Sequence, residues 1–296
     1  MTPDGRITSE FDDVTVVSGP AATAAPAGAD GDVDWDEFDV VEDALDREDD
    51  ADDRDEDDLA DLELVVLDLA GTTVVDDGLV ERAFERAAEV AGIGETPDDR
   101  AAALAFVRDT MGQSKIAVFR SLTGDEDQAQ HANAVFESAY AELAASEGLR
   151  AVPGAEELIR RLRSSGVKVA LTTGFSRTTQ DAVLDALGWR DLADVTLSPA
   201  EAGRGRPFPD LPLTALLRTG ASSVEGMVVV GDTASDIASG IAAGAGLVVG
   251  VLTGAHDEQT LLDAGADAVL PSVADLPELL GFEVPADDAA EGSGTR

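Results

Sequence analysis

The stretch that decides the fold is Leu62-Glu-Leu-Val-Val-Leu-Asp-Leu-Ala70, followed directly by Gly71-Thr72-Thr73. An apolar run of this length that ends in a turn is typical of a strand buried on both faces of a parallel sheet. Similar runs recur at 168–173, 194–197, 226–232 and 246–252, and helical patterns lie between them at 154–166, 176–188, 209–220 and 235–244. This alternation predicts an α/β fold with a doubly wound, Rossmann-like parallel sheet and right-handed crossovers.

Residues 78–150 interrupt this alternation and carry no strand signal. They contain amphipathic helical patterns such as LVERAFERAAEVAG and QSKIAVFRSLTG. An insert directly after the first strand would lie over the carboxyl ends of the sheet, where ligands bind in such folds. We therefore expect a helical cap at 78–150, a core at 62–77 and 151–284, and a polar tail at 285–296.

Residues 1–61 differ sharply from the rest of the chain. They hold 23 Asp and Glu against three Arg, a net charge of -20. Like charges repel, and so few apolar side chains cannot offset the entropy of ordering, so a disordered acidic tail is expected. Within it, 34–46 could form a short partner-binding helix or remain a solvated part of the tail.

The whole chain has 61 acidic and 20 basic residues and a formal charge of -41. This charge argues against nucleic acid and anionic membranes as partners. There is no cysteine, so disulfides and thiolate catalysis are excluded. Neither a signal peptide nor an apolar run of 18 residues occurs, and a cytoplasmic protein is the expectation.

Four motifs follow predicted strands and together suit phosphoryl transfer. Asp68 ends the first strand and can act as nucleophile and metal ligand. Thr172 ends the next strand and can donate to phosphoryl oxygens, as can the fixed charge of Arg206. Asp232 and Asp236, in Gly-Asp-Thr-Ala-Ser-Asp, can hold Mg²⁺ directly or through water. Their order along the chain makes a chance coincidence improbable.

These motifs resemble those of the haloacid dehalogenase superfamily over roughly residues 62–282, with the insert in the position of its C1-type cap. That family normally has a second Asp two residues after the nucleophile, as general acid and base, but this chain has Ala70. One branch carries alanine there: the phosphonatase-like hydrolases, which cleave phosphorus–carbon bonds. The resemblance extends to both core and cap, through the motifs that begin at Asp68, Met111, Thr172, Gly205 and Val230.

In the resembled branch a cap lysine forms a Schiff base with the substrate aldehyde, and the matching residue is Lys115. Only Lys115 and Lys168 are lysines, whereas 18 residues are arginines, which cannot form a Schiff base. The alternatives are that Lys115 is an exposed cap lysine, or that it merely binds phosphate as a point charge. The resemblance implies a catalytic set and a Mg²⁺ set, namely Asp68, Lys115, Thr172 and Arg206, and Asp68, Ala70, Asp232 and Asp236. It also implies a substrate-binding set: Ala70, Gly71, Thr72, Met111, Gly112, Thr173, Gly174 and Arg177. Arg177 could instead simply cap the sheet.

Three residues depart from the phosphonatase pattern. Val118 stands in place of a histidine, Phe175 in place of a tyrosine and Leu79 in place of a cysteine. These apolar replacements leave the substrate open. The two histidines, His131 and His256, are expected at the surface rather than in catalysis.

The leading hypothesis is a Mg²⁺-dependent hydrolase that cleaves the phosphorus–carbon bond of a small phosphono-aldehyde. One alternative is a phosphomonoesterase for a phosphoglycolate-like or sugar phosphate. Another is a non-catalytic sensor of a phosphorylated metabolite whose acidic tail recruits a partner. The helical face LVERAFERAAEV could form a homodimer through the cap, or pack within the cap.

Overall fold

The computed structural model describes residues 62–94 and 96–282. The expected tails at 1–61 and 285–296, and the segment 34–46, lie outside the described residues. The elements, in chain order, are β1(Leu64–Asp68), α1(Leu79–Ala91), α2(Pro97–Asp109), α3(Lys115–Thr123), α4(Glu126–Glu147), α5(Ala155–Ser164), β2(Lys168–Thr172), α6(Arg177–Leu187), β3(Val195–Leu197), α7(Pro199–Ala202), α8(Asp210–Thr219), β4(Met227–Gly231), α9(Ala234–Ala243), β5(Leu247–Val251), α10(Glu258–Asp263), β6(Ala268–Leu270), a 3₁₀ turn η2(Val273–Asp275) and α11(Leu276–Leu279).

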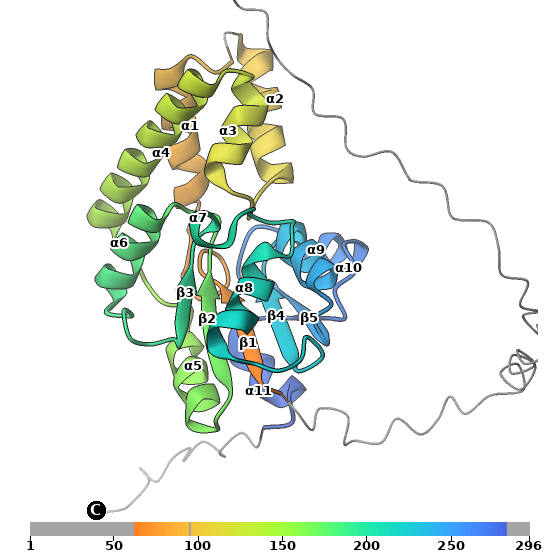
Figure 1. Cartoon of the computed structure of the whole chain (residues 1–296). Helices are drawn as coiled ribbons and strands as arrows, with labels where there is room; N and C mark the ends of the chain where they lie inside the picture. The colour runs from red at the N-terminus through yellow and green to blue at the C-terminus, as the bar shows by residue number, and fades with distance from the viewer. Residues whose placement is uncertain (1–61, 95, 283–296) are drawn as a thin grey trace, which may run out of the picture. The chain divides into compact units, whose positions relative to one another are not determined.

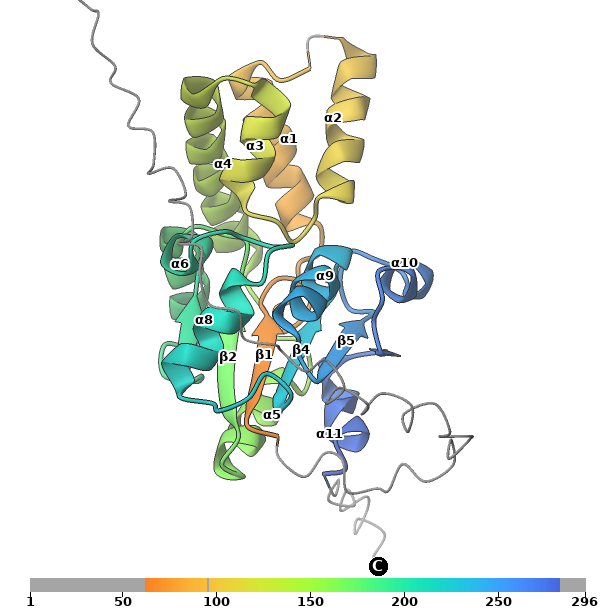
Figure 2. The ribbon, with the colours of Figure 1, turned by 45° about the vertical axis from the view of Figure 1, so that its right-hand side comes forward.

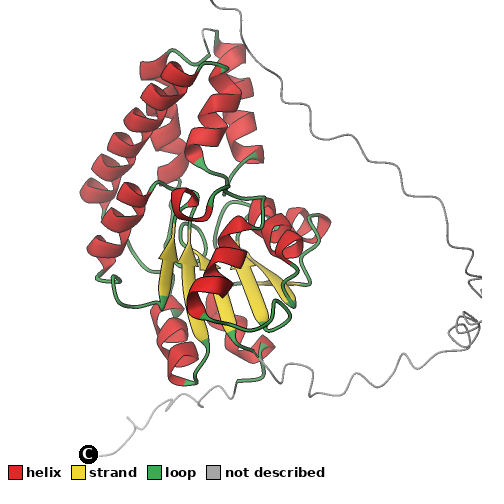
Figure 3. Ribbon diagram, in the orientation of Figure 1, coloured by secondary structure: helices red, strands yellow, loops and turns green. Residues whose placement is uncertain are grey.

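The strands form one parallel sheet in the order β3-β2-β1-β4-β5-β6. β1 lies in the middle, and its neighbours β2 and β4 are far from it in sequence, so each needs a crossover. Figure 3 shows the strands as one layer with helices on both sides. The predicted doubly wound α/β fold is confirmed.

Both faces of β1 are buried, which explains its unbroken apolar sequence. Val65 and Leu67 join one core cluster, whereas Leu64 and Val66 join another. Successive side chains of a strand point to opposite faces, so a strand covered by helices on both sides must be apolar throughout.

The inserted helices α1 to α4 lie over the carboxyl ends of the strands, as Figures 1 and 2 both show. The apolar face of α1, which includes Val80 and Phe84, is buried, and α1 packs chiefly against α4 of the same chain. This is the second of the two roles expected for that face. A homodimer through another part of the cap stays a prediction.

An aromatic cluster joins the cap to the core. The rings of Phe84, Phe119, Phe136 and Tyr140 belong to the cap, and Phe175 comes from the loop after β2. The Phe175 ring centroid lies 4.7 Å from that of Tyr140 and 6.3 Å from that of Phe136. Such ring pairs stabilise by about 0.5–1.5 kcal/mol beyond the burial of their area. Phe175 therefore helps to hold the cap against the sheet.

Several short elements were not predicted from the sequence, namely β6, α7, α10 and α11. β6 has three half-buried residues and α10 has six residues, too few to show a periodicity. In the described residues no helix is long and apolar enough to cross a lipid bilayer.

Candidate active site

The carboxyl edge of the sheet brings the predicted strand-end residues together. Asp68 ends β1 and pairs in register with Thr172, which ends β2. Asp232 follows β4, the neighbour of β1 on the other side. Asp68, Thr172 and Asp232 are all buried. Parallel strands end at the same edge, so this meeting follows from the topology.

Arg206 connects this edge to the cap. Its Nη1 lies 2.7 Å from Asp68 Oδ1 and its Nε lies 2.8 Å from Asp236 Oδ1. Its Nη2 donates to Thr172 Oγ1 at 2.7 Å, and Nη1 also donates to the carbonyl oxygen of Gly112 at 3.3 Å. The guanidinium is thus fixed beside Asp68 and presents a buried positive charge to any group that binds there.

Asp232 and Asp236 are held by different contacts. Asp232 accepts a hydrogen bond from Thr72 Oγ1 at 3.0 Å and one from the Ala255 amide at 2.8 Å. Asp236 accepts from the Thr233 amide at 3.1 Å and completes the capping box of α9. A capping role alone would explain an aspartate at 236, but its ion pair with Arg206 shows that it also faces the site.

The charges of this cluster do not balance. Three buried carboxylates, those of Asp68, Asp232 and Asp236, lie in this cluster, and the buried guanidinium of Arg206 pairs with two of them, Asp68 and Asp236. Burial, opposed by Arg206, raises the pKa of Asp68 to about 7, and burial together with the charge of Asp68 raises that of Asp232. An excess of buried negative charge is what a divalent cation would offset.

The available donors suit Mg²⁺, an ion that is seldom enclosed by protein ligands alone. Within the described residues no three His, Asp or Glu side chains gather into a metal-binding group. Mg²⁺ usually keeps several waters and binds through only one or two carboxylates. Asp68 and Asp232 can supply those carboxylates. Ala70 can contribute only its backbone carbonyl oxygen, and Asp236 is already paired with Arg206 Nε. The residues therefore fit the predicted cofactor.

This cluster predicts how stability depends on pH. The folded-state pKa of Asp68 is above its ordinary value, so the folded protein binds more protons between about pH 4 and pH 7. Without Mg²⁺ the Asp68 contribution to the free energy of unfolding should fall as pH rises through that window, by at most about 1.4 kcal/mol per pH unit. Asp68→Asn removes this contribution.

Thermal melts in EDTA at several pH values measure the effect. We expect the melting temperature of Asp68→Asn to exceed that of the wild type increasingly as pH rises from 5 to 7, and the difference to level off above pH 7. Mg²⁺ should raise the wild-type melting temperature at pH 8 and have little effect on the variant. A constant difference between the two melting temperatures at all pH values would contradict this account.

Two glycines allow the backbone to approach the cluster closely. Gly71 has φ 91°, and a Cβ there would overlap the Asp232 carboxylate. Gly112, in the cap segment before α3, has φ 84°, and a Cβ there would overlap the Thr233 hydroxyl. Both conformations lie in the left-handed region that favours glycine. The second glycine lets the cap reach the start of α9.

Lys115 begins the cap helix α3 at this contact. Its amide donates to the Gly174 carbonyl oxygen at 3.2 Å, and its Nζ lies 5.8 Å from the Phe175 ring centroid. Burial lowers the pKa of Lys115, against the opposing charges of Asp76 and Asp68. A lowered pKa increases the fraction of free amine, the form that attacks a carbonyl.

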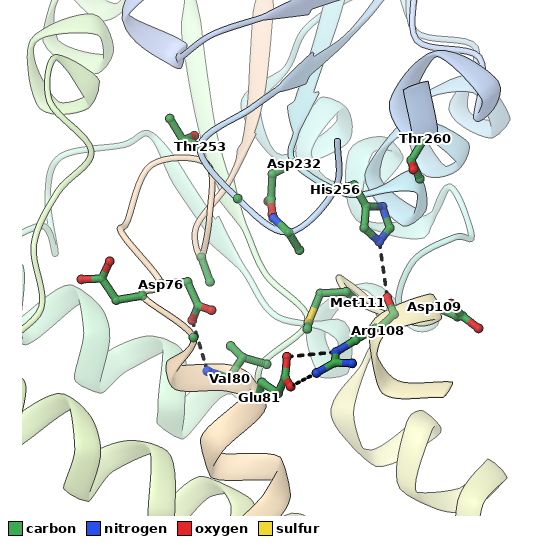
Figure 4. A pocket seen from close by; sticks show the side chains of 15 residues that line it. Asp76, Val80, Glu81, Arg108, Asp109, Met111, Asp232, Thr253, His256 and Thr260 are labelled. Atoms are coloured by element: carbon green, nitrogen blue, oxygen red, sulfur yellow. Dashed lines mark hydrogen bonds and ion pairs between the residues drawn. The ribbon is translucent and has the colours of Figure 1, made fainter. Parts of the chain in front are cut away.

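A cavity of about 600 Å³ opens beside the cluster (Figure 4). Its walls include Ala70 and Asp232 from the core and Met111 from the cap. At position 70, where the sequence comparison with the resembled superfamily places the usual acid–base aspartate, this cavity therefore has only a methyl group. Two further wall residues, Asp76 and His256, were not among the predicted site residues.

Asp76 is a half-buried carboxylate at the start of the cap. Its Oδ1 accepts from the Val80 amide at 3.2 Å, at the beginning of α1. Burial raises the pKa of Asp76, against the opposing charge of Lys115. In the sequence, Asp76-Asp77-Gly78 resembles an ordinary helix start, so nothing there separated the two aspartates. Asp77 is exposed and forms an ion pair with Arg150.

We expect Asp76→Asn to lower the pKa of Lys115 further, because it removes a negative charge that favours the ammonium form. Acetylation of Lys115, followed by mass spectrometry across a pH series, should reach half of its maximal rate at a lower pH in this variant. Asp77→Asn is the matched control and should leave the profile unchanged. Equal profiles for both variants would show that Asp76 has no influence on Lys115.

His256 is half-buried rather than fully at the surface. Its Nδ1 accepts from the Ala234 amide at 2.9 Å, and its Nε2 lies 3.3 Å from the carbonyl oxygen of Arg108 at the end of α2. His256 thereby links the core to the cap, a contact that depends on tertiary placement and has no signal in the sequence.

Among the substrate-binding predictions, the structure does not bring Arg177 to the cluster. Arg177 begins α6, with a side chain 43% exposed, and forms ion pairs with Asp181 at 2.9 Å and Glu201 at 3.0 Å. Two surface carboxylates therefore hold it. Thr173 is buried, and its Oγ1 accepts from the Phe175 amide at 3.1 Å, which fixes the loop beside Lys115.

The three departures from the phosphonatase pattern have different surroundings. Val118 and Leu79 are 4% and 2% exposed and belong to the continuous hydrophobic core. Phe175 packs in the aromatic cluster and also faces Lys115. Only Phe175 of the three is therefore placed to meet a ligand at the Lys115 amine.

A parallel sheet with an inserted helical cap and this edge of carboxylates defines a class of enzyme. The chain belongs to the haloacid dehalogenase-like hydrolases, whose family model matches residues 62–244.

The chain is also similar to particular proteins. A phosphonoacetaldehyde hydrolase of Bacteroides fragilis is 28% identical over 261 residues, covering 74% of this chain and 95% of that protein. Among solved structures, a phosphonoacetaldehyde hydrolase-like protein of Oleispira antarctica has a TM-score of 0.64 and 26% identity, covering 75% of this chain and 92% of that one. A hydrolase of Pseudomonas syringae, 24% identical over 74% of this chain and 98% of its own, shares the fold with a TM-score of 0.65.

Proposed function

We propose that the protein is a Mg²⁺-dependent, phosphonatase-like hydrolase that cleaves the phosphorus–carbon bond of a small phosphono-carbonyl compound. The observation that carries this proposal is the pairing of Ala70 with Lys115. Ala70 lacks the usual proton donor, and Lys115 supplies an amine whose pKa is lowered by burial and whose charge is influenced by Asp68. The named relatives support the same activity.

Cleavage of a phosphorus–carbon bond needs a place for the electron pair that stays on carbon. Protonation of a leaving oxygen cannot help, because there is none, so an acid at position 70 has no task. Condensation of the Lys115 amine with the substrate carbonyl releases water and forms an iminium. When the phosphorus–carbon bond breaks, its electron pair enters this iminium and gives an enamine.

Asp68 accepts the phosphoryl group. One of its carboxylate oxygens forms a bond to phosphorus as the phosphorus–carbon bond breaks, giving an aspartyl phosphate. Water then hydrolyses this intermediate to phosphate and free Asp68. The enamine takes a proton on carbon, and a second water hydrolyses the resulting iminium to the organic product and the Lys115 amine.

The other residues bind and orient the phosphoryl group. Arg206, fixed beside Asp68, can donate to the phosphoryl oxygens, and Thr172 Oγ1 supports the guanidinium at 2.7 Å. Asp68 and Asp232, with the backbone of Ala70, would hold Mg²⁺, which supplies positive charge to offset the negative charge on the phosphoryl oxygens. The Phe175 ring, whose centroid lies 5.8 Å from the Lys115 Nζ, provides an apolar surface beside the amine.

Phosphate release tests this function directly. Purified protein is assayed with phosphonoacetaldehyde and with a panel of phosphate monoesters, including phosphoglycolate and sugar phosphates, in Mg²⁺ and in EDTA. We expect Mg²⁺-dependent release from a phosphono-carbonyl substrate and rates at least about 100-fold lower for the monoesters, because the monoester leaving group needs the acid that position 70 lacks. Efficient release from a monoester alone would favour the phosphomonoesterase alternative.

A further inference from the structure

A second cavity, of about 400 Å³, lies among α3, the loop after β2 and the loop between α7 and α8. Its charged wall residues are all cations: Lys115, Arg120, Arg204 and Arg206. None of the described residues that line it is Asp or Glu. In a chain with 61 acidic and 20 basic residues, this separation of charge favours an anion at that place. We call it the basic cavity.

Arg120 and Arg204 each use one edge of the guanidinium for a carboxylate outside the cavity wall. Arg120 donates from Nε and Nη2 to Glu126, both at 2.7 Å. Arg204 donates from Nε and Nη2 to Asp210, at 3.1 and 2.7 Å. Guanidinium has five N–H donors, and within residues 62–94 and 96–282 the Nη1 atom of neither arginine has a partner.

These ion pairs therefore orient the arginines and leave donors for a ligand. The Arg204 guanidinium also lies 4.3 Å from the Phe208 ring centroid, which fixes its plane. Phe208 itself is 46% exposed and lines the basic cavity. A planar guanidinium held in this way suits a carboxylate, whose two oxygens accept parallel hydrogen bonds.

We propose that the basic cavity binds a carboxylate on the organic part of the substrate, so that the enzyme prefers phosphono-oxo acids to phosphonoacetaldehyde. In such an acid the carbonyl next to the phosphonomethyl group also carries the carboxylate. This inference rests on the proposed phosphonatase function. Lys115, which would condense with that carbonyl, lines the basic cavity, and so does Arg206, whose Nη1 lies 2.7 Å from Asp68.

The chemistry is that of the proposed function, with a ketone in place of an aldehyde. The Lys115 nitrogen bonds to the ketone carbon and water leaves, giving an iminium. Asp68 takes the phosphoryl group, and the phosphorus–carbon electron pair forms an enamine that still carries the carboxylate. Protonation on carbon and addition of water release a 2-oxo acid and the amine. No oxidant, reductant or other co-reactant is needed.

The test compares two substrates in one enzyme. The smallest phosphono-oxo acid, 3-phosphonopyruvate, and phosphonoacetaldehyde are assayed for phosphate release by the wild type, Arg120→Gln and Arg204→Gln. Arg160→Gln is the matched control, because Arg160 is an exposed arginine paired with Glu156 at 2.6 Å, outside the basic cavity. Melting temperatures of all four proteins report whether each variant is folded.

We expect the wild-type kcat/KM for 3-phosphonopyruvate to be at least tenfold higher than that for phosphonoacetaldehyde. Arg120→Gln and Arg204→Gln should each lower that value about tenfold or more, as expected for a lost charged hydrogen bond, and change the aldehyde value less than threefold. Equal loss for both substrates, or a preference for the aldehyde that neither variant alters, would overturn the inference and leave the phosphonatase function standing. Phosphate from neither substrate would refute the phosphonatase function, and the inference with it.

Discussion

Asp68→Asn is expected to abolish phosphate release from every substrate, with a fall in kcat of at least about 10⁴-fold. The amide cannot form the phosphoryl ester, and it removes one of the two carboxylates that would bind Mg²⁺. Arg206 keeps its ion pair with Asp236 at 2.8 Å, so the local structure should survive. Steady-state phosphate assays over a substrate series measure the effect.

Stability separates loss of chemistry from loss of fold in this variant. Removal of a carboxylate from a cluster with excess negative charge relieves repulsion, so without Mg²⁺ the variant should melt at the same temperature as the wild type or higher. Full phosphatase or phosphonatase activity in a well-folded Asp68→Asn protein would show that Asp68 is not the nucleophile.

Lys115→Arg is expected to lower phosphorus–carbon cleavage at least about 10³-fold, although it keeps the positive charge. Arginine stays protonated and cannot form an iminium. Any slow hydrolysis of a phosphate monoester needs only Asp68, Arg206 and Mg²⁺, so it should change less than about tenfold. The ratio of the two activities in one preparation is the informative measurement.

The chain provides its own control for this substitution. Lys168 is the only other lysine. It is exposed at the start of β2, in the α/β domain and away from the cap, and its Nζ lies 3.8 Å from Asp194 Oδ1. Lys168→Arg should keep both activities. A Lys115→Arg enzyme that cleaves phosphorus–carbon bonds as fast as the wild type would mean that Lys115 acts only as a point charge.

The fold was predictable because its signals are local. Each of the five predicted strands is centred on an apolar run, and the four cap helices show their own periodicity. The predicted meeting of Asp68, Thr172 and Asp232 needed only the rule that parallel strands end at one edge. The short elements β6 and α10 were not predicted, because their three and six residues are too few to establish a period and β6 is only half-buried.

The rest of the site depends on tertiary contacts that a sequence does not display. Asp76 and Asp77 are identical neighbours on the wall of one cavity, yet Asp76 is half-buried and acts on the charge of Lys115, whereas Asp77 is exposed and pairs with Arg150. Arg177 lies in a matched motif, yet Glu201 and Asp181 hold its side chain. The basic cavity arises only when α3 of the cap meets the loop that carries Arg204.

Reductive trapping tests the central claim most directly. The wild type is incubated with phosphonoacetaldehyde or 3-phosphonopyruvate and sodium borohydride, and the digested protein is analysed by mass spectrometry. The account predicts a substrate-dependent adduct on Lys115, none on Lys168, and loss of activity in proportion to labelling. Turnover of either substrate with no adduct on Lys115 would contradict it.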